Sequence, residues 1–199
     1  MNQVALTDVA AALWSRVVKG TRIVGIDGPS GSGKTSLARL LVDQTAATLV
    51  EIDDFVSWTD FAGWWPRFND QVLKPLLLGN DAHYQVRDWQ HDPMGSSLNG
   101  WKIARWSPLI ILEGVTCTRR AIADHLAFRI WVEAPREVRL ARGLTRDGDA
   151  SRDLWIEWMR VEQEFFLTDG TRHRADLCVD GTVPSGTARE SEIVILDEI

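Results

Sequence analysis

Apolar residues are distributed along the chain in two alternating patterns. Four short continuous apolar runs predict strands that are buried on both faces of a sheet, at residues 21–27, 48–53, 107–115 and 127–134. Longer stretches repeat apolar residues every three or four positions and predict helices over residues 6–18, 36–46, 67–78, 118–126, 135–148 and 151–167. Because strands alternate with helices, we expect right-handed crossovers and a parallel sheet.

The remaining segments are shorter and less regular. Residues 83–89 and 101–106 predict two short strands on either side of a turn that contains Pro93 and Gly100. Near the C-terminus, residues 175–181 and 192–196 predict the last strands. We therefore expect one α/β domain over residues 1–199, with three layers and a mostly parallel five-stranded sheet.

A glycine-rich turn, GPSGSGKT, lies between the first predicted strand and the next helix, at Gly28–Thr35. Its spacing is that of a P-loop, in which glycines let successive backbone N–H groups face one concavity and the helix N-terminus adds positive potential. Lys34 is expected to reach the outer phosphates, and the Thr35 hydroxyl to ligate Mg²⁺. The predicted nucleotide-binding residues here are Gly28, Ser30, Gly31, Ser32, Gly33, Lys34, Thr35 and Ser36. The motif predicts a P-loop nucleotide-binding fold.

Acidic residues end two of the predicted strands. Asp53 and Asp54 close one strand, and Glu113 closes the apolar run Leu109–Leu112. Ligands of open α/β sheets bind at the carboxyl ends of the strands. An aspartate there can accept the proton of an acceptor hydroxyl, and a buried glutamate needs a partner such as Mg²⁺. The alternative is that these are ordinary solvated strand-end acids.

The helix predicted over residues 135–148 has arginines at positions 136, 139, 142 and 146, and the last three follow one stripe. Guanidinium groups fit the oxygens of a transferring phosphoryl group, so the stripe predicts a lid over the triphosphate within residues 135–152. Arg142 and Arg146 are the leading candidates, followed by Arg139. A solvated surface of mixed charge is the alternative.

Composition narrows the class of protein. The net charge of −6 argues against nucleic acid as a partner, and no apolar run is long enough to span a membrane. Two widely spaced cysteines indicate a reducing compartment, from which we expect a cytoplasmic location. The chain has neither the N-K-x-D motif of GTPases nor an LSGGQ-like transporter signature. These absences favour a small-molecule kinase, while the oligomeric state, including a homo-oligomer, stays open.

Several segments together resemble the uridine kinase-like branch of the P-loop small-molecule kinases. They are IDGPSGSGKTSLARLL, IDDF at residues 52–55, ILEGV at 111–115, VRLARGLTRDG at 138–148 and RADLCVDG near the C-terminus. The resemblance implies ATP- and Mg²⁺-dependent phosphorylation of a small-molecule hydroxyl, most naturally on a nucleoside. It favours Asp53 as the base and gives Asp54 a role with Mg²⁺ or substrate. Val56 stands where the family commonly has tyrosine.

The acceptor is expected to bind within residues 55–106, and five of the ten tryptophans fall between residues 58 and 101. Tryptophans can stack on a planar base or pack against a sugar, although core packing explains many of them. Two other functions stay open: a kinase for a sugar or cofactor precursor, and a nucleotide-binding regulatory module with little turnover. Acceptor-dependent ADP release distinguishes an enzyme from such a module.

Overall fold

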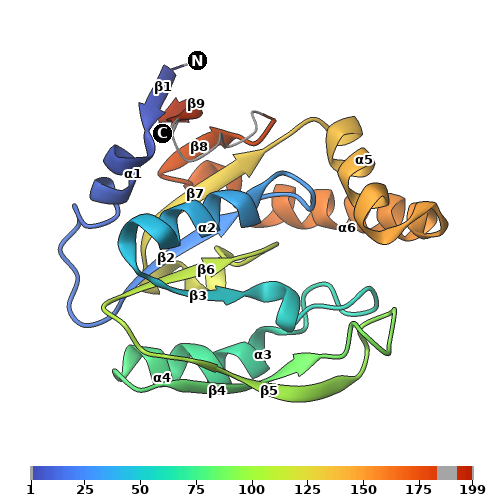
Figure 1. Cartoon of the computed structure of the whole chain (residues 1–199), viewed down its shortest axis with the longest axis horizontal. Coiled ribbons are helices and arrows are strands. Elements are labelled where there is room, and N and C mark those ends of the chain that lie inside the picture. Colours follow the sequence, from blue (N-terminus) through green and yellow to red (C-terminus); the bar gives the residue numbers. More distant parts are fainter. Residues whose placement is uncertain (1, 183–191, 199) are drawn as a thin grey trace.

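The computed structural model describes residues 2–182 and 192–198 and is built around one twisted sheet (Figure 1). Seven strands follow the order β1-β9-β8-β7-β2-β6-β3. The five strands at the β3 side of this order run parallel and comprise β2 (Arg22–Asp27), β3 (Thr48–Glu51), β6 (Leu109–Glu113), β7 (Leu126–Glu133) and β8 (Leu177–Asp180). The predicted α/β class with a mostly parallel sheet is confirmed.

The prediction of five strands is wrong, because two antiparallel strands extend the sheet beyond β8. They are β1 (Asn2–Ala5) and β9 (Glu192–Glu198), and Val4 of β1 lies opposite Ile193 of β9. The N and C labels in Figure 1 accordingly lie close together. The two strands lie far apart in the sequence, so no local pattern reveals that they pair.

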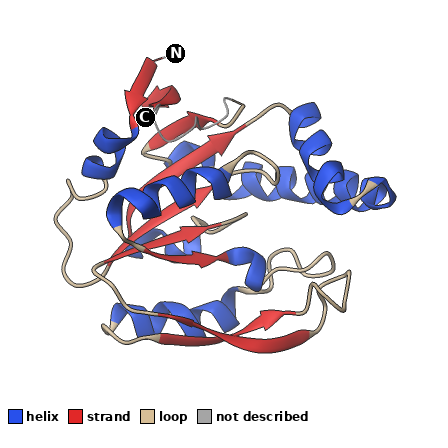
Figure 2. Cartoon of the chain, viewed as in Figure 1, coloured by secondary structure: helices blue, strands red, loops and turns tan. Residues whose placement is uncertain are grey.

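Both faces of the parallel sheet are covered, as the continuous apolar runs predict. Ile111 of β6 packs in the same cluster as Leu37 and Leu41 of α2 (Lys34–Thr45), together with α1 (Leu6–Ala12). Its neighbours Ile110 and Leu112 belong to the cluster on the opposite face. The alternation follows from the period of two in a strand, which sends successive side chains to opposite faces. Figure 2 shows α2 lying across the sheet.

The N-terminal helix is shorter than predicted. The periodicity of residues 6–18 predicts one long helix, but α1 ends at Ala12. Leu6, Val9 and Leu13 are buried, whereas Val17 is 98% exposed and adds nothing to the apolar face. Without tertiary packing a last helical turn gains too little to form.

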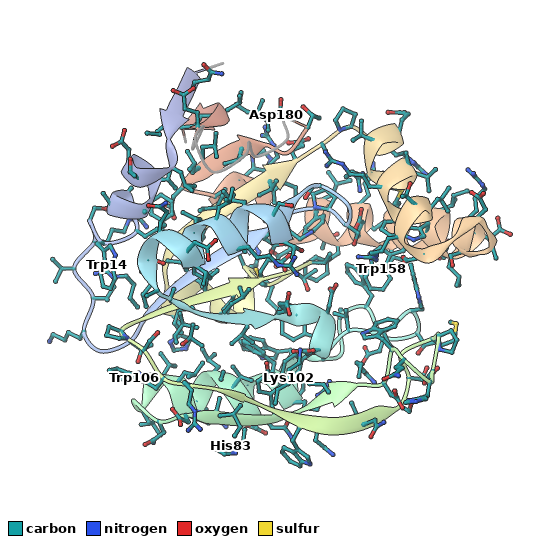
Figure 3. All side chains as sticks on the ribbon, viewed as in Figure 1. Trp14, His83, Lys102, Trp106, Trp158 and Asp180 are labelled. Atoms are coloured by element: carbon teal, nitrogen blue, oxygen red, sulfur yellow. The ribbon has the colours of Figure 1, made fainter. Side chains whose placement is uncertain are left out.

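The segment between β3 and β6 forms a separate layer beneath the sheet in Figure 1. The 3₁₀ turn η1 (Ile52–Asp54) leads to a helical stretch of α3 (Trp65–Phe68), a π-helical turn (Asn69–Leu73) and α4 (Lys74–Leu77). An antiparallel hairpin follows, made of β4 (Ala82–Arg87) and β5 (Leu98–Ala104). Figure 3 shows Lys102 on this hairpin. The two short strands predicted on either side of a turn are thus a hairpin outside the main sheet.

The lid predicted over residues 135–152 falls in the helices that follow β7. Helix α5 (Arg136–Asp147) is joined by a 3₁₀ turn (Asp149–Ser151) to α6 (Arg152–Asp169), and two more 3₁₀ turns cover Arg120–His125 and Arg172–Arg174. Within the described ranges, no helix is long and apolar enough to cross a membrane.

The contact between α5 and α6 depends on Gly143. A Cβ atom at Gly143 would lie 2.3 Å from the Trp155 ring, which is almost fully buried. Gly143→Ala is therefore expected to lower the free energy of unfolding by about 1–3 kcal/mol, the usual range for overpacking. Helix propensity alone predicts the opposite sign, a gain of about 1 kcal/mol. Denaturant unfolding measures the difference.

Thr145→Ala on the exposed face of α5 is the matched control and is expected to follow helix propensity. A Gly143→Ala protein more stable than the parent would show that α5 and α6 are not closely packed at this position.

Candidate functional site

The glycine-rich turn leaves β2 at its carboxyl end and leads into α2. Gly28 has φ of +142°, and a Cβ there would lie 2.1 Å from the Val132 carbonyl oxygen of β7, so only glycine fits. The Lys34 ammonium donates to the Pro29 carbonyl at 2.9 Å, so the Lys34 side chain folds back toward the beginning of its own loop. The turn predicted from the sequence is therefore a closed cradle at the edge of the sheet where ligands of this fold class bind.

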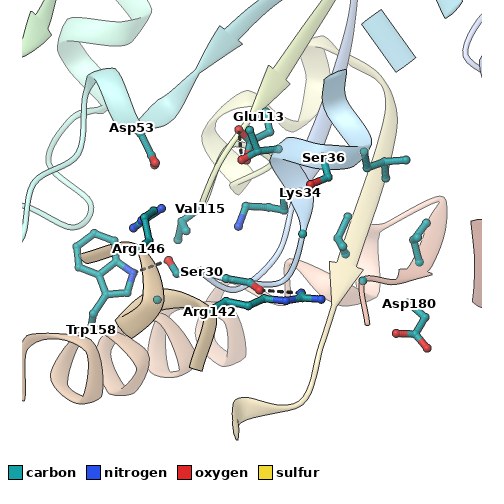
Figure 4. A pocket seen from close by; sticks show the side chains of 18 of the residues that line it. Ser30, Lys34, Ser36, Asp53, Glu113, Val115, Arg142, Arg146, Trp158 and Asp180 are labelled. Atoms are coloured by element: carbon teal, nitrogen blue, oxygen red, sulfur yellow. Dashed lines mark hydrogen bonds between the residues drawn. The ribbon is translucent and has the colours of Figure 1, made fainter. Parts of the chain in front are cut away.

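The cradle forms one wall of a cavity of about 370 Å³ (Figure 4). Ten of the predicted site residues line this cavity: Ser30, Gly31, Gly33, Lys34, Thr35, Ser36, Asp53, Glu113, Arg142 and Arg146. They come from the P-loop and the start of α2, the 3₁₀ turn η1 after β3, the end of β6, and helix α5. Gly28, Ser32, Arg139 and Asp54 were also predicted as site residues and are not among the lining residues.

The start of α2 is suited to a phosphate. Its N-cap, Gly33, offers no side-chain cap to the first helical N–H groups, and the first turn has no acidic residue. Uncapped N–H groups at a helix N-terminus favour an anion. The donors along this wall therefore fit nucleotide phosphates.

Glu113 and Thr35 face each other across the cavity floor. The Thr35 hydroxyl donates to Glu113 Oε2 at 3.2 Å, and Glu113 is only 5% exposed. Burial raises the pKa of Glu113 to about 7, with further help from Asp53 and Glu51 and against the effect of Lys34. A bound cation would favour the charged carboxylate instead. A single carboxylate beside a hydroxyl is a donor set that fits Mg²⁺, which commonly uses one or two carboxylates plus phosphates and water.

The two adjacent aspartates have different surroundings. Asp53 lines the cavity, and no described side chain hydrogen-bonds to its carboxylate. The Asp54 carboxylate accepts from Lys102 Nζ at 2.8 and 2.9 Å and from the Tyr84 hydroxyl at 3.2 Å, so it anchors the β4–β5 hairpin. Burial, together with this proximity to Asp54, raises the pKa of Tyr84. The structure brings Asp53, and not Asp54, to the phosphate cradle.

The three arginines of the predicted stripe likewise have different partners. Arg142 donates to the Gly31 carbonyl at 3.1 Å, and Arg146 is held by Asp147 at 2.7 Å with its guanidinium 5.6 Å from the Trp155 ring. Both line the cavity. Arg139 instead forms an ion pair with Glu162 of α6.

Aromatic side chains from two segments complete the cavity. Trp58 and Trp89 come from the expected acceptor segment, and Trp155 and Trp158 from α6. The Trp89 indole donates to the Asp53 carbonyl at 2.9 Å, which ties it to the acidic turn. The other four tryptophans of that segment do not line the cavity: Trp64 is buried in the core, Trp65 packs beside it, and Trp101 and Trp106 are 64% and 40% exposed.

Sequence analysis missed two buried acids beside the P-loop. Asp27 accepts from the N–H groups of Gly28, Thr116 and Thr118, at 2.7–2.9 Å, and from the Thr118 hydroxyl. Glu162 accepts from the Ser30 N–H at 2.9 Å. An acid at the end of an apolar strand signals the first, whereas nothing in the helical pattern of α6 distinguishes Glu162 from the exposed acids around it.

Comparison with known proteins gives a consistent result. Residues 24–164 match the family model described as AAA domain, which is more than half of the chain. A curated uridine kinase from Oceanobacillus iheyensis is 24% identical over 79% of this chain and 85% of its own length. A second curated uridine kinase, from Halobacterium salinarum, is 22% identical over 88% of this chain and 84% of its own length. The resemblance to uridine kinase-like P-loop proteins is thereby confirmed.

Solved structures share the fold. A possible uridine kinase from Bacillus stearothermophilus superposes with a TM-score of 0.64 at 18% identity, covering 87% of this chain and 96% of the other. A Silicibacter protein described as a fructose transport system kinase gives 0.59 at 19% identity, covering 79% and 89%.

The Asp27 network generates a stability prediction. In Asp27→Asn one carboxylate oxygen becomes an NH₂ group that faces a backbone N–H. We expect the free energy of unfolding to fall by about 1–3 kcal/mol, the cost of a buried unsatisfied polar group. Denaturant unfolding measures it.

Asp43→Asn, on the exposed face of α2, is the control and should change stability by less than about 0.5 kcal/mol. An equally small change in Asp27→Asn would mean that the four hydrogen bonds do not hold the cradle.

Proposed function

We propose that this chain, which belongs to the AAA domain family, transfers the γ-phosphoryl group of ATP to a hydroxyl of a small molecule in a Mg²⁺-dependent reaction, with a nucleoside as the favoured acceptor. One observation carries the proposal. The P-loop, a carboxylate free to accept a proton, and two lid arginines all line one cavity that also has aromatic walls.

Each polar residue has a distinct role in this proposal. Lys34, Arg142 and Arg146 stabilise the negative charge that spreads over the transferring phosphoryl oxygens. Thr35 and Glu113 would hold Mg²⁺, which when bound neutralises phosphate charge. Asp53 accepts the proton of the attacking hydroxyl.

Asp54 was also predicted to hold Mg²⁺ or substrate. We now assign it to the hairpin instead, because Lys102 and Tyr84 already occupy its carboxylate.

The walls of the cavity favour an acceptor with a planar ring. Trp58 packs edge-on against Trp158 with ring centroids 5.3 Å apart, and its backbone N–H donates to the Met94 carbonyl. Trp89 is fixed by Asp53 and by Gly95, where a Cβ would lie 2.7 Å from the indole ring. Rigid aromatic surfaces suit a nucleobase, since stacking needs little further ordering. A sugar kinase is the second candidate, favoured by the fold shared with the fructose transport system kinase.

An ADP-release screen tests the proposal. Nucleosides, sugars and vitamin precursors are each added with MgATP, and pyrimidine nucleosides are expected to stimulate ADP release most. Lys34→Ala is the control and should lower turnover by about 10²–10³. Stimulation by a sugar alone would overturn the nucleoside assignment, and ATP binding without acceptor-dependent ADP release would indicate a regulatory module.

The different surroundings of the two aspartates give a paired prediction. Asp53→Asn is expected to lower kcat by about 10²–10⁴ with nearly unchanged ATP affinity, because it removes the base and keeps the shape. Asp54→Asn should act mainly on the hairpin and on acceptor KM. Steady-state kinetics with the best acceptor distinguishes them, and a larger kcat loss in Asp54→Asn would reverse the assignment.

A further inference from the structure

Helix α6 binds the third residue of the P-loop through two side chains. The Ser30 N–H donates to Glu162 Oε2 at 2.9 Å, and the Trp158 indole donates to the Ser30 hydroxyl at 2.7 Å. Trp158 and Glu162 are four residues apart and so share one helix face. Figure 4 shows the contact between Trp158 and Ser30 beside the cavity. The conformation of the P-loop thus depends on a helix more than a hundred residues away in sequence.

Helix α5 supports the same loop from the other side. Its Arg139 donates to the Glu162 carboxylate, to the Ala134 carbonyl at 3.1 Å and to the Ser30 carbonyl at 3.4 Å. The α5 backbone also lies so close to Gly31 that a Cβ there would be 2.7 Å from the Arg139 carbonyl oxygen. The Arg139 side chain is 12% exposed and does not line the cavity. Its surroundings are those of a buried ion pair rather than of a phosphate ligand.

Electrostatics explains why Glu162 needs Arg139 as a partner. Glu162 is 1% exposed, and burial raises its pKa, while the Ser30 N–H and Arg139 act in the opposite direction. An unpaired buried carboxylate next to a phosphate site would be costly by itself and would repel the phosphates. Arg139 offsets both the burial cost and the repulsion, because its positive charge neutralises the Glu162 carboxylate that binds the Ser30 N–H.

We infer that Glu162 is a positioning residue that fixes the P-loop peptide at Ser30, and that Arg139 pairs with Glu162 instead of binding the nucleotide. The inference rests on the proposed function only in that a nucleotide must occupy the P-loop. It separates the lid arginines into one that builds the cradle and two, Arg142 and Arg146, that face the cavity.

Binding of MgADP, measured by titration calorimetry, tests the inference on four proteins. These are the parent chain, Glu162→Ala, Arg139→Gln, and the double variant Glu162→Gln with Arg139→Gln. Each single variant is expected to lose at least tenfold in affinity, since one removes the acceptor of the Ser30 N–H and the other leaves a buried charge unpaired. The double variant should return to within threefold of the parent. Its amide oxygen at position 162 still accepts from the Ser30 N–H, and the NH₂ group of the same amide can bond to the new amide at position 139.

A phosphate-binding Arg139 gives a different result. The double variant would then bind MgADP as weakly as Arg139→Gln, and the inference would be overturned. Unchanged affinity in Glu162→Ala would overturn it as well. The double variant remains decisive even where Glu162→Ala does not fold.

Glu164→Gln is the matched control, because Glu164 lies on the same helix, is 65% exposed and pairs with Arg160. Its affinity for MgADP should equal that of the parent chain. Thermal unfolding without nucleotide identifies any fold defect, and binding is measured well below the unfolding midpoint. If the parent binds MgADP but phosphorylates no acceptor, the kinase proposal fails while this inference stands; absent MgADP binding overturns both.

Discussion

A phosphate cradle must keep backbone N–H groups pointing at one place without a ligand to hold them there. In this chain the Asp27 carboxylate supplies that restraint, because it binds the first N–H of the P-loop and two N–H groups of the turn after β6. Glu113 ends β6 immediately before that turn. One buried carboxylate therefore fixes the distance between the P-loop and Glu113, the residue proposed to hold Mg²⁺. The restraint acts before any substrate arrives, as preorganised electrostatic stabilisation requires.

The loop after β3 is held in place by a different kind of contact. Arg67 and Arg87 both donate to the Phe55 carbonyl, and Arg67 lies 4.4 Å above the Phe55 ring. Burial and the neighbouring Arg87 lower the pKa of Arg67 to about 10. Two arginines that share one carbonyl repel each other, so Asp54 and Asp60 nearby are needed to hold them. Arg67 and Arg87 thus hold the loop that carries Asp53, although neither arginine lines the cavity.

The sequence predicts the parts of this protein that depend on local pattern. The P-loop, the strand ends with Asp53 and Glu113, and the arginine stripe are all readable because spacing alone places them. The sequence cannot separate Asp53 from Asp54, since the difference lies in Lys102, which reaches Asp54 from a hairpin nearly fifty residues away. It also does not reveal the ion pair between Arg139 and Glu162, because helical spacing within α5 says nothing about what α6 places beside it. The pairing of β1 with β9 is hidden for the same reason: it joins segments at the two ends of the described chain.

That edge pairing has a consequence for how the site is completed during synthesis. Gln3 and Val4 lie opposite Val194 and Ile193, and the latter two line the cavity. During translation β1 emerges long before β9, so its backbone groups have no partner from β9 until β9 has been made. Closing so long a loop is entropically costly and tends to be late in folding. A nascent chain that has completed the P-loop but not yet β9 lacks the wall formed by Ile193 and Val194, so its nucleotide site is open on one side.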